Sequence, residues 1–200
     1  MYKKIVIGID QSYTRTGISI AADNVLLKVS YIPFEPTECH TLKRNKVVNK
    51  LIHIIGLNQG KASELVVIVE RIRQFSGGNL SMSYIKSTGA LIGCIVDAAY
   101  SLGVPVYSAD TKSWKARVVG TSVPLANKFN VDPKKWPTIQ YMLKRKDVKE
   151  RDLLVAVSNR CKKFSIMIDG VKYMYNDDAA DSAGIALYGF AKGRILNKEE

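Results

Sequence analysis

Three carboxylates crowd into one short segment near the end of the sequence. The segment NDDAADSAGIALYGFAKG, residues 176–193, holds Asp177, Asp178 and Asp181 within five positions. If this segment is helical, Asp178 and Asp181 lie three residues apart and share one face of the helix. Acids in a first helical turn commonly cap the helix and complement its dipole, so the spacing alone is compatible with a helix cap or with a ligand set.

Two more acids stand at the ends of apolar strands. Asp10 follows KKIVIGI and Glu70 follows ELVVIV, where the core pattern would otherwise continue with a hydrophobic residue. Open α/β sheets carry their sites at the carboxyl ends of their strands. An acid that ends a buried strand therefore indicates a site more clearly than an acid in a helical first turn does.

The two strands and the last helix can bring four acids to one end of the sheet: Asp10, Glu70, Asp178 and Asp181. This requires that the two strands are neighbours and that the helix packs beside them. Small residues in that helix allow its close approach. Four carboxylates stay ionised together only if cations neutralise them. Oxygen ligands with no His or Cys nearby favour Mg²⁺ or Mn²⁺. A pair of such ions about 4 Å apart activates a water and stabilises the leaving oxygen of a phosphodiester. These residues therefore predict a two-metal phosphodiester hydrolase.

The overall charge indicates a polyanionic partner. The 200 residues contain 30 Lys and Arg against 18 Asp and Glu, a net charge of +12. A surplus of this size attracts polyanions, of which nucleic acid is the leading candidate; the alternative is a merely soluble surface. Basic residues recur along residues 112–163, and no separable basic tail is present.

The composition predicts one globular domain over residues 1–200, since a chain of this length can bury a core without the help of disulfides or structural metal ions. Cys39, Cys94 and Cys161 are odd in number and widely spaced, which argues against a disulfide framework and a zinc site. The apolar runs are too short for a signal peptide or a membrane span. We expect a protein of a reducing cytoplasm with no membrane partner.

The chain alternates strands and helices in a β-α-β order, which predicts an α/β fold with a central mixed five-stranded sheet flanked by helices. Two tight turns are expected, at Asp23-Asn24 and at Asp169-Gly170. The expected strands are residues 4–10, 17–21, 25–32, 64–70 and 104–107, with a hairpin over 164–175; the expected helices are residues 41–58, 81–102, 110–119, 137–145, 149–163 and 178–196, and residues 120–136 form a loop.

Three segments, in this order, resemble the RuvC family of Holliday-junction resolvases within the RNase H-like superfamily: GIDQSYTRTGISI at 8–20, VVIVERI at 66–72 and DDAADSAGIAL at 177–187. WKARVVG at 114–120 also looks like the V-K-x-x-V-V-G segment of that family. The resemblance implies an RNase H-like fold. It further implies a homodimeric, Mg²⁺-dependent endonuclease that resolves four-way DNA junctions by paired symmetric nicks.

Transferred by position, the family's four metal-binding acids fall on Asp10, Glu70, Asp178 and Asp181, with the D-A-A-D spacing intact. Asp177 has no counterpart and could support the ligands or cap the helix. Lys115 matches the family's basic residue, and Phe75 lies near the aromatic that wedges into the junction. The alternatives for the predicted DNA contacts are a solvated surface charge and an ordinary loop aromatic; these contacts are Arg71, Arg73, Phe75, Lys112, Lys115, Lys134 and Lys135.

The chain also departs from the family pattern. Gln11-Ser12 replaces the usual Pro-Gly, residues 121–133 look like an insertion, and the hairpin at 164–175 lies outside the bacterial pattern. These departures point to a divergent member, such as one encoded by a bacteriophage and acting in the host cytoplasm.

Parts of the sequence are compatible with three rival functions. The N-terminal motif also resembles the phosphate-binding turn of actin-like ATPases, but those need two domains, and Gly77-Gly78 is no P-loop, so no nucleotide cofactor is expected. A catalytically inactive module that binds DNA junctions without cutting them would not need the four acids. An RNase H or a broader debranching nuclease remains open, because the metal core is shared and only the binding surface differs.

Overall fold

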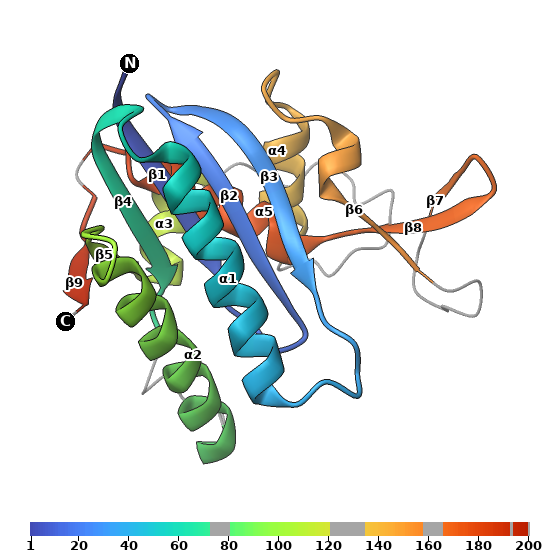
Figure 1. The fold of residues 1–200 in the computed structure, drawn as a ribbon. Helices are drawn as coiled ribbons and strands as arrows, with labels where there is room; N and C mark the ends of the chain where they lie inside the picture. Colours follow the sequence, from blue (N-terminus) through green and yellow to red (C-terminus); the bar gives the residue numbers. More distant parts are fainter. Residues whose placement is uncertain (73–80, 121–134, 158–165, 193, 200) are drawn as a thin grey trace.

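The computed structural model describes residues 1–72, 81–120, 135–157, 166–192 and 194–199. Its centre is a mixed six-stranded sheet in the order β3-β2-β1-β4-β5-β9 (Figure 1). The predicted α/β class with a mixed sheet is confirmed, and β9 adds a sixth strand to the five expected. The strands are β1 (Tyr2–Asp10), β2 (Arg15–Ala22), β3 (Val25–Pro33), β4 (Ala62–Glu70), β5 (Val106–Ala109) and β9 (Asn197–Glu199).

Helices cover both faces of the sheet, with α1 and α2 on one face and α5 on the other (Figure 1). The apolar run of β1 explains this layering, because alternate side chains of a strand point to opposite faces. Ile5, Ile7 and Ile9 pack in the core cluster of α1 and α2, whereas Val6 packs with Ile185 of α5. The helices are α1 (His40–Asn58), α2 (Met82–Tyr100), α3 (Thr111–Trp114), α4 (Trp136–Leu143) and α5 (Asp177–Tyr188).

The last helix is shorter than predicted. α5 ends at Tyr188 instead of continuing to Leu196, and the chain turns back over Gly189. Residues Asn197–Glu199 then pair antiparallel with β5 as the edge strand β9. The helical period of the sequence gave no indication of this strand, which is short and polar.

A second, three-stranded sheet contains the predicted hairpin, formed by β7 (Ile166–Ile168) and β8 (Val171–Tyr175). Asp169 and Gly170 at its turn have positive φ, as expected for a two-residue hairpin loop. The helix predicted over residues 149–163 is wrong as far as the structure describes it: a 3₁₀ turn at Glu150–Leu153 precedes β6 (Leu154–Ala156), which pairs with β8. Burial of Leu153 and Leu154 in one core cluster with Tyr175 stabilises this pairing.

The helix predicted over residues 110–119 is present but changes geometry midway. Asp110 caps α3 by accepting hydrogen bonds from the backbone N–H groups of Lys112 and Ser113. A π-helical turn, Lys115–Val119, continues it and ends at Gly120, whose φ is +75°. π-helical turns frequently mark functional positions.

Over the described residues, no helix combines the length and apolarity needed to cross a bilayer.

Candidate active site

The four predicted acids line one cavity of about 330 Å³ at the carboxyl ends of the central strands. Asp10 ends β1, Glu70 ends β4, and Asp178 and Asp181 face them from the first two turns of α5. All four are only partly exposed. The structure thus brings together residues that are up to 171 positions apart in the sequence (Asp10 to Asp181).

The sheet register and two glycines position these acids. Ile9 lies opposite Val69 in the parallel β1–β4 pair, so Asp10 and Glu70 follow at neighbouring strand ends. α5 crosses directly over Gly8 and Gly17 of β1 and β2. A Cβ atom at Gly17 would lie 1.8 Å from the carbonyl oxygen of Asp178, so only glycine permits this approach.

The end of β4 is held by two neighbours. The Trp114 indole Nε1–H donates to Glu70 Oε1 over 3.1 Å. The Gln11 side-chain amide donates to the Glu70 carbonyl oxygen over 2.6 Å, and its oxygen accepts from the Glu70 backbone N–H over 3.1 Å. Gln11 therefore ties the loop after β1 to the end of β4. These contacts orient the Glu70 carboxylate toward the cavity.

Two cationic side chains hold the acids of α5. Arg15, at the start of β2, donates from Nε to Asp178 Oδ2 over 3.0 Å. Lys115, the first residue of the π-helical turn, donates from Nζ to Asp181 Oδ2 over 3.2 Å. Each cation therefore neutralises one of the two carboxylates that share a face of α5.

Asp177 belongs to a separate ion pair. It accepts from Lys135, immediately before α4, and its other oxygen lies 3.9 Å from an Arg15 guanidinium nitrogen. The helix cap is Asn176, whose side chain accepts from the backbone N–H of Ala179 over 3.3 Å. The geometry of Asp177 therefore fits a role in supporting the neighbouring acids through its ion pairs. It does not fit a role as the helix cap.

Burial, together with the charges of neighbouring carboxylates, raises the pKa values of three of these acids. Burial is the largest cause for Asp10, Asp178 and Asp181. Neighbouring carboxylates, Glu70 first, raise the pKa of Asp10 further, to well above the ordinary value. For Asp181 burial and the Glu70 charge outweigh the opposing Lys115 ammonium, and the pKa rises to about 6. At a pH above these pKa values, the side chains that line the cavity carry an excess of negative charge.

These residues fit divalent metal ions. The donors are carboxylate oxygens, which Mg²⁺ and Mn²⁺ prefer. Asp181 Oδ1 is buried and has no hydrogen-bond partner among the described residues, which is a costly state for a carboxylate oxygen unless a ligand completes it. In the part of the chain that the structure describes, no three His, Cys, Asp or Glu side chains converge at ligand distance. Instead, Arg15 forms an ion pair with Asp178, and Lys115 forms an ion pair with Asp181.

Neutralising Asp10 is expected to stabilise the metal-free protein. A carboxyl with a raised folded pKa destabilises the fold above that pKa, and the penalty disappears as the pH falls below the unfolded value near 4. In EDTA at pH 7.5, Asp10→Asn should therefore raise the melting temperature by about 2–6 °C, and the gain should shrink at pH 5. Differential scanning calorimetry at both pH values measures this. An equal or lower melting temperature of the variant at pH 7.5 would contradict the proposed charge excess.

Four of the seven residues predicted to contact DNA lie in the part of the chain that the structure describes. Arg71 is exposed and lines the acid cavity, and Lys112 is exposed on α3 beside Thr111, which also lines it. Lys115 and Lys135 lie at the cavity but pair with acids of α5. Arg73, Phe75 and Lys134 lie outside the described residues.

Several residues at the cavity were not predicted as site residues. Trp114 and Gln11 position Glu70, Arg15 pairs with Asp178, and exposed Tyr84 of α2 also lines the cavity. A sequence signal existed for Arg15, since it lies in the same motif as Asp10 and starts the neighbouring strand. No comparable signal existed for Tyr84.

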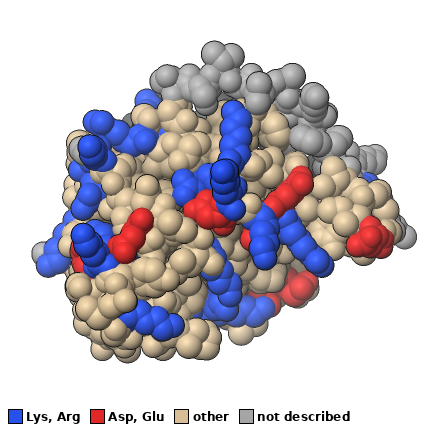
Figure 2. Space-filling view, turned by 90° about the horizontal axis from the view of Figure 1, so that it is seen from above, with Lys and Arg blue, Asp and Glu red and all other residues tan. Residues whose placement is uncertain are grey.

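Lys and Arg side chains are spread over the face of the molecule shown in Figure 2, and several lie next to Asp or Glu. The net charge of +12 is therefore not concentrated in one patch on this face.

Comparison with known proteins identifies the fold. No protein-family model matches the chain, and no curated protein matches it in sequence. Among solved structures, RuvC of Thermus thermophilus superposes with a TM-score of 0.59 at 18% identity, over 98% of this chain and 99% of that one. The same protein in complex with a Holliday junction substrate gives 0.58 at 17% identity, over 98% and 99%. The yeast mitochondrial Holliday junction resolvase Ydc2 gives 0.50 at 16% identity, over 91% of this chain and 75% of that chain.

Proposed function

We propose that this chain, which has the fold of the RuvC resolvases, is a divalent-metal-dependent DNA endonuclease that resolves four-way junctions by paired symmetric nicks. The observation that carries the proposal is that Asp10, Glu70, Asp178 and Asp181 line one cavity of that fold. The fold alone does not specify a function, because related folds host several chemistries. The acid cavity supplies the site that the proposed hydrolysis requires.

The four acids would hold two Mg²⁺ or Mn²⁺ ions. Bound there, the ions supply an activated water and charge stabilisation at the leaving oxygen of the phosphodiester. Trp114 and Gln11 keep Glu70 at the end of β4 in the orientation needed for ligation. The buried, unpartnered Asp181 Oδ1 supplies a ligand atom without first breaking a hydrogen bond.

Basic residues around the cavity would hold the DNA backbone. Arg71 borders the acids, Lys112 is exposed nearby on α3, and Lys115 and Lys135 reach the cavity from two other elements. Arg73, Phe75 and Lys134 are proposed as further contacts on sequence position alone. The similarity to a RuvC bound to a Holliday junction substrate supports branched DNA as the partner.

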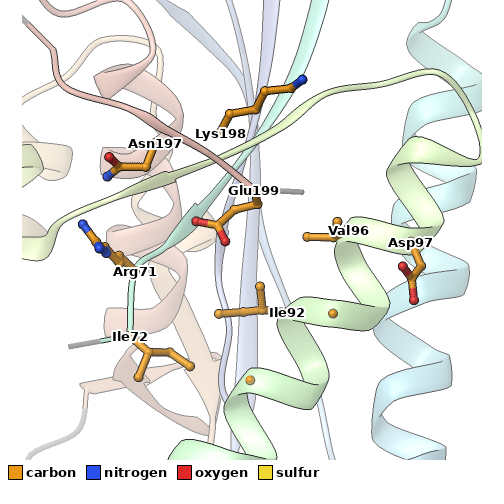
Figure 3. A pocket seen from close by; sticks show the side chains of 10 residues that line it. Arg71, Ile72, Ile92, Val96, Asp97, Asn197, Lys198 and Glu199 are labelled. Atoms are coloured by element: carbon orange, nitrogen blue, oxygen red, sulfur yellow. The ribbon is translucent and has the colours of Figure 1, made fainter. Parts of the chain in front are cut away.

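Symmetric cleavage requires two active sites, and we propose a homodimer formed through α2. Gly89 and Gly93 of α2 are exposed, and beyond their own helix turn no atom of the described residues lies within 4 Å of where their Cβ atoms would be. Beside them a pocket of about 590 Å³ opens between α2, with Ile92 and Val96, and the edge strand β9 (Figure 3). Sedimentation equilibrium tests the proposal, which a monomer mass at micromolar concentration would contradict.

Cleavage of labelled synthetic substrates tests the function. The panel contains a four-way junction, a linear duplex, a flap and an RNA/DNA hybrid, each with Mg²⁺ and with EDTA. We expect paired nicks at symmetric positions of the junction, in Mg²⁺ only. Cleavage of the hybrid alone would favour an RNase H, and equal cleavage of flap and junction would favour a broader debranching nuclease.

A further inference from the structure

We propose that Arg15 and Lys115 exchange partners during the reaction cycle: they hold Asp178 and Asp181 in the metal-free protein and bind a backbone phosphate of the DNA when metal occupies the acids. This inference rests on the proposed function and adds a consequence to it. Metal binding and DNA binding strengthen each other through these two side chains.

Arg15 and Lys115 occupy carboxylate oxygens for which a metal ion would compete. Arg15 Nε lies 3.0 Å from Asp178 Oδ2, and Lys115 Nζ lies 3.2 Å from Asp181 Oδ2. A metal ion bound to the same oxygens needs the lone pairs that these N–H groups now occupy, and its positive charge repels both side chains. A metal ion that takes the Oδ2 atom of either carboxylate therefore displaces the cation bound there, and an ion that takes only the free Oδ1 of Asp181 still weakens the Lys115 contact by charge repulsion.

Both side chains can move without leaving the cavity. They are long, retain 27% and 30% side-chain exposure, and come from separate elements, β2 and the π-helical turn. Lys115 Nζ also lies 5.0 Å from the Trp114 ring centroid, a cation–π contact that remains when Asp181 is released. Guanidinium and ammonium groups bind phosphate with the same donors that they offer to carboxylates. Once released, the two cations would be free to bind a phosphate at the acid cavity.

The exchange couples the two ligands. Without metal, the acids hold the cations and present negative charge to an incoming phosphate. With metal, the cations are free for the phosphate, so DNA binds more tightly, and by linkage DNA tightens metal binding by the same factor. The pair between Lys135 and Asp177 lies outside the proposed ligand set, and we expect it to persist in both states.

The experiment measures binding in the absence of turnover. Calcium replaces magnesium, gels verify that the junction remains uncut, and circular dichroism verifies folding of each variant. Without DNA, Arg15→Gln is expected to bind Ca²⁺ about 3–10-fold more tightly than the wild type by calorimetry, because the competing cation is gone. With a fluorescent four-way junction, Ca²⁺ is expected to tighten wild-type binding about tenfold relative to EDTA and Arg15→Gln binding by less than about threefold.

Two further variants serve as controls. Arg15→Lys keeps the charge and should retain most of the coupling. Arg194→Gln removes the same charge at an exposed position beside Lys4 and Glu64, at the opposite ends of β1 and β4, and should behave as the wild type.

Each other outcome identifies what fails. If the wild type binds no divalent ion, the proposed function fails and the inference fails with it. A second outcome is that the wild type binds Ca²⁺ but Arg15→Gln and Lys115→Gln bind it more weakly. The two residues would then only position the ligands. The exchange would be overturned, and the proposed nuclease function would be unaffected. Unchanged coupling in Arg15→Gln would overturn the exchange in the same way.

Discussion

Asp10→Asn is expected to lower the rate of junction cleavage in Mg²⁺ by about 1,000-fold or more, because losing one ligand of the proposed metal site removes several kcal/mol of transition-state stabilisation. Asp10 lies at the end of β1 and lines the cavity with the other three acids. The expected loss concerns the reaction only. Junction affinity measured in EDTA should remain within a few-fold of the wild type, because the proposed phosphate contacts are untouched and no metal contributes to binding in either protein.

Single-turnover cleavage and fluorescence anisotropy measure the two quantities on the same junction. Asp169→Asn is the matched control, since Asp169 lies in the hairpin turn with φ of +49°, a conformation that asparagine tolerates well. It should cleave as the wild type does. Full Mg²⁺-dependent activity of Asp10→Asn would show that the acid cavity is not the catalytic site.

Gly17→Ala is expected to destabilise the fold by about 2–4 kcal/mol, because an added methyl group cannot be accommodated without moving backbone. The new Cβ would lie 1.8 Å from the carbonyl oxygen and 2.5 Å from the carbonyl carbon of Asp178. The contact is with α5 itself, so the helix must shift away from β2. Because α5 carries Asp178 and Asp181, the same shift should also weaken metal binding and cleavage.

Urea denaturation measures the free energy of unfolding, and Gly56→Ala supplies the control. Gly56 is an exposed residue of α1, and no atom lies within 4 Å of its Cβ position. Alanine there should leave the protein equally stable or up to about 1 kcal/mol more stable through helix propensity. A Gly17→Ala variant as stable as the wild type would mean that α5 does not pack as closely as described.

The sequence was sufficient to predict that the four acids lie together, because the signal for each position is local. Asp10 and Glu70 each interrupt an apolar run at its last position, and the parallel β1–β4 pairing then places them side by side. Asp178 and Asp181 have helical spacing, and the structure confirms the helix. The order of strands and helices also follows from local periodicity.

The partners of these acids could not be predicted, because each pair depends on tertiary packing. Arg15 and Asp178 are 163 residues apart, and Trp114 and Glu70 are 44 residues apart. No periodicity relates such positions. The helix predicted over residues 149–163 failed for a related reason, since Leu154–Ala156 pairs with β8 and tertiary pairing overrides local propensity.

The most direct test of the account is to locate the metal. Crystals of the protein grown with Mn²⁺ and measured at the manganese absorption edge should show two anomalous peaks about 4 Å apart, bounded by Asp10, Glu70, Asp178 and Asp181, with Arg15 and Lys115 turned away from the two α5 carboxylates. A map with no peak in the cavity at saturating Mn²⁺, and with both ion pairs intact, would contradict the central claim that these acids form a divalent-metal site.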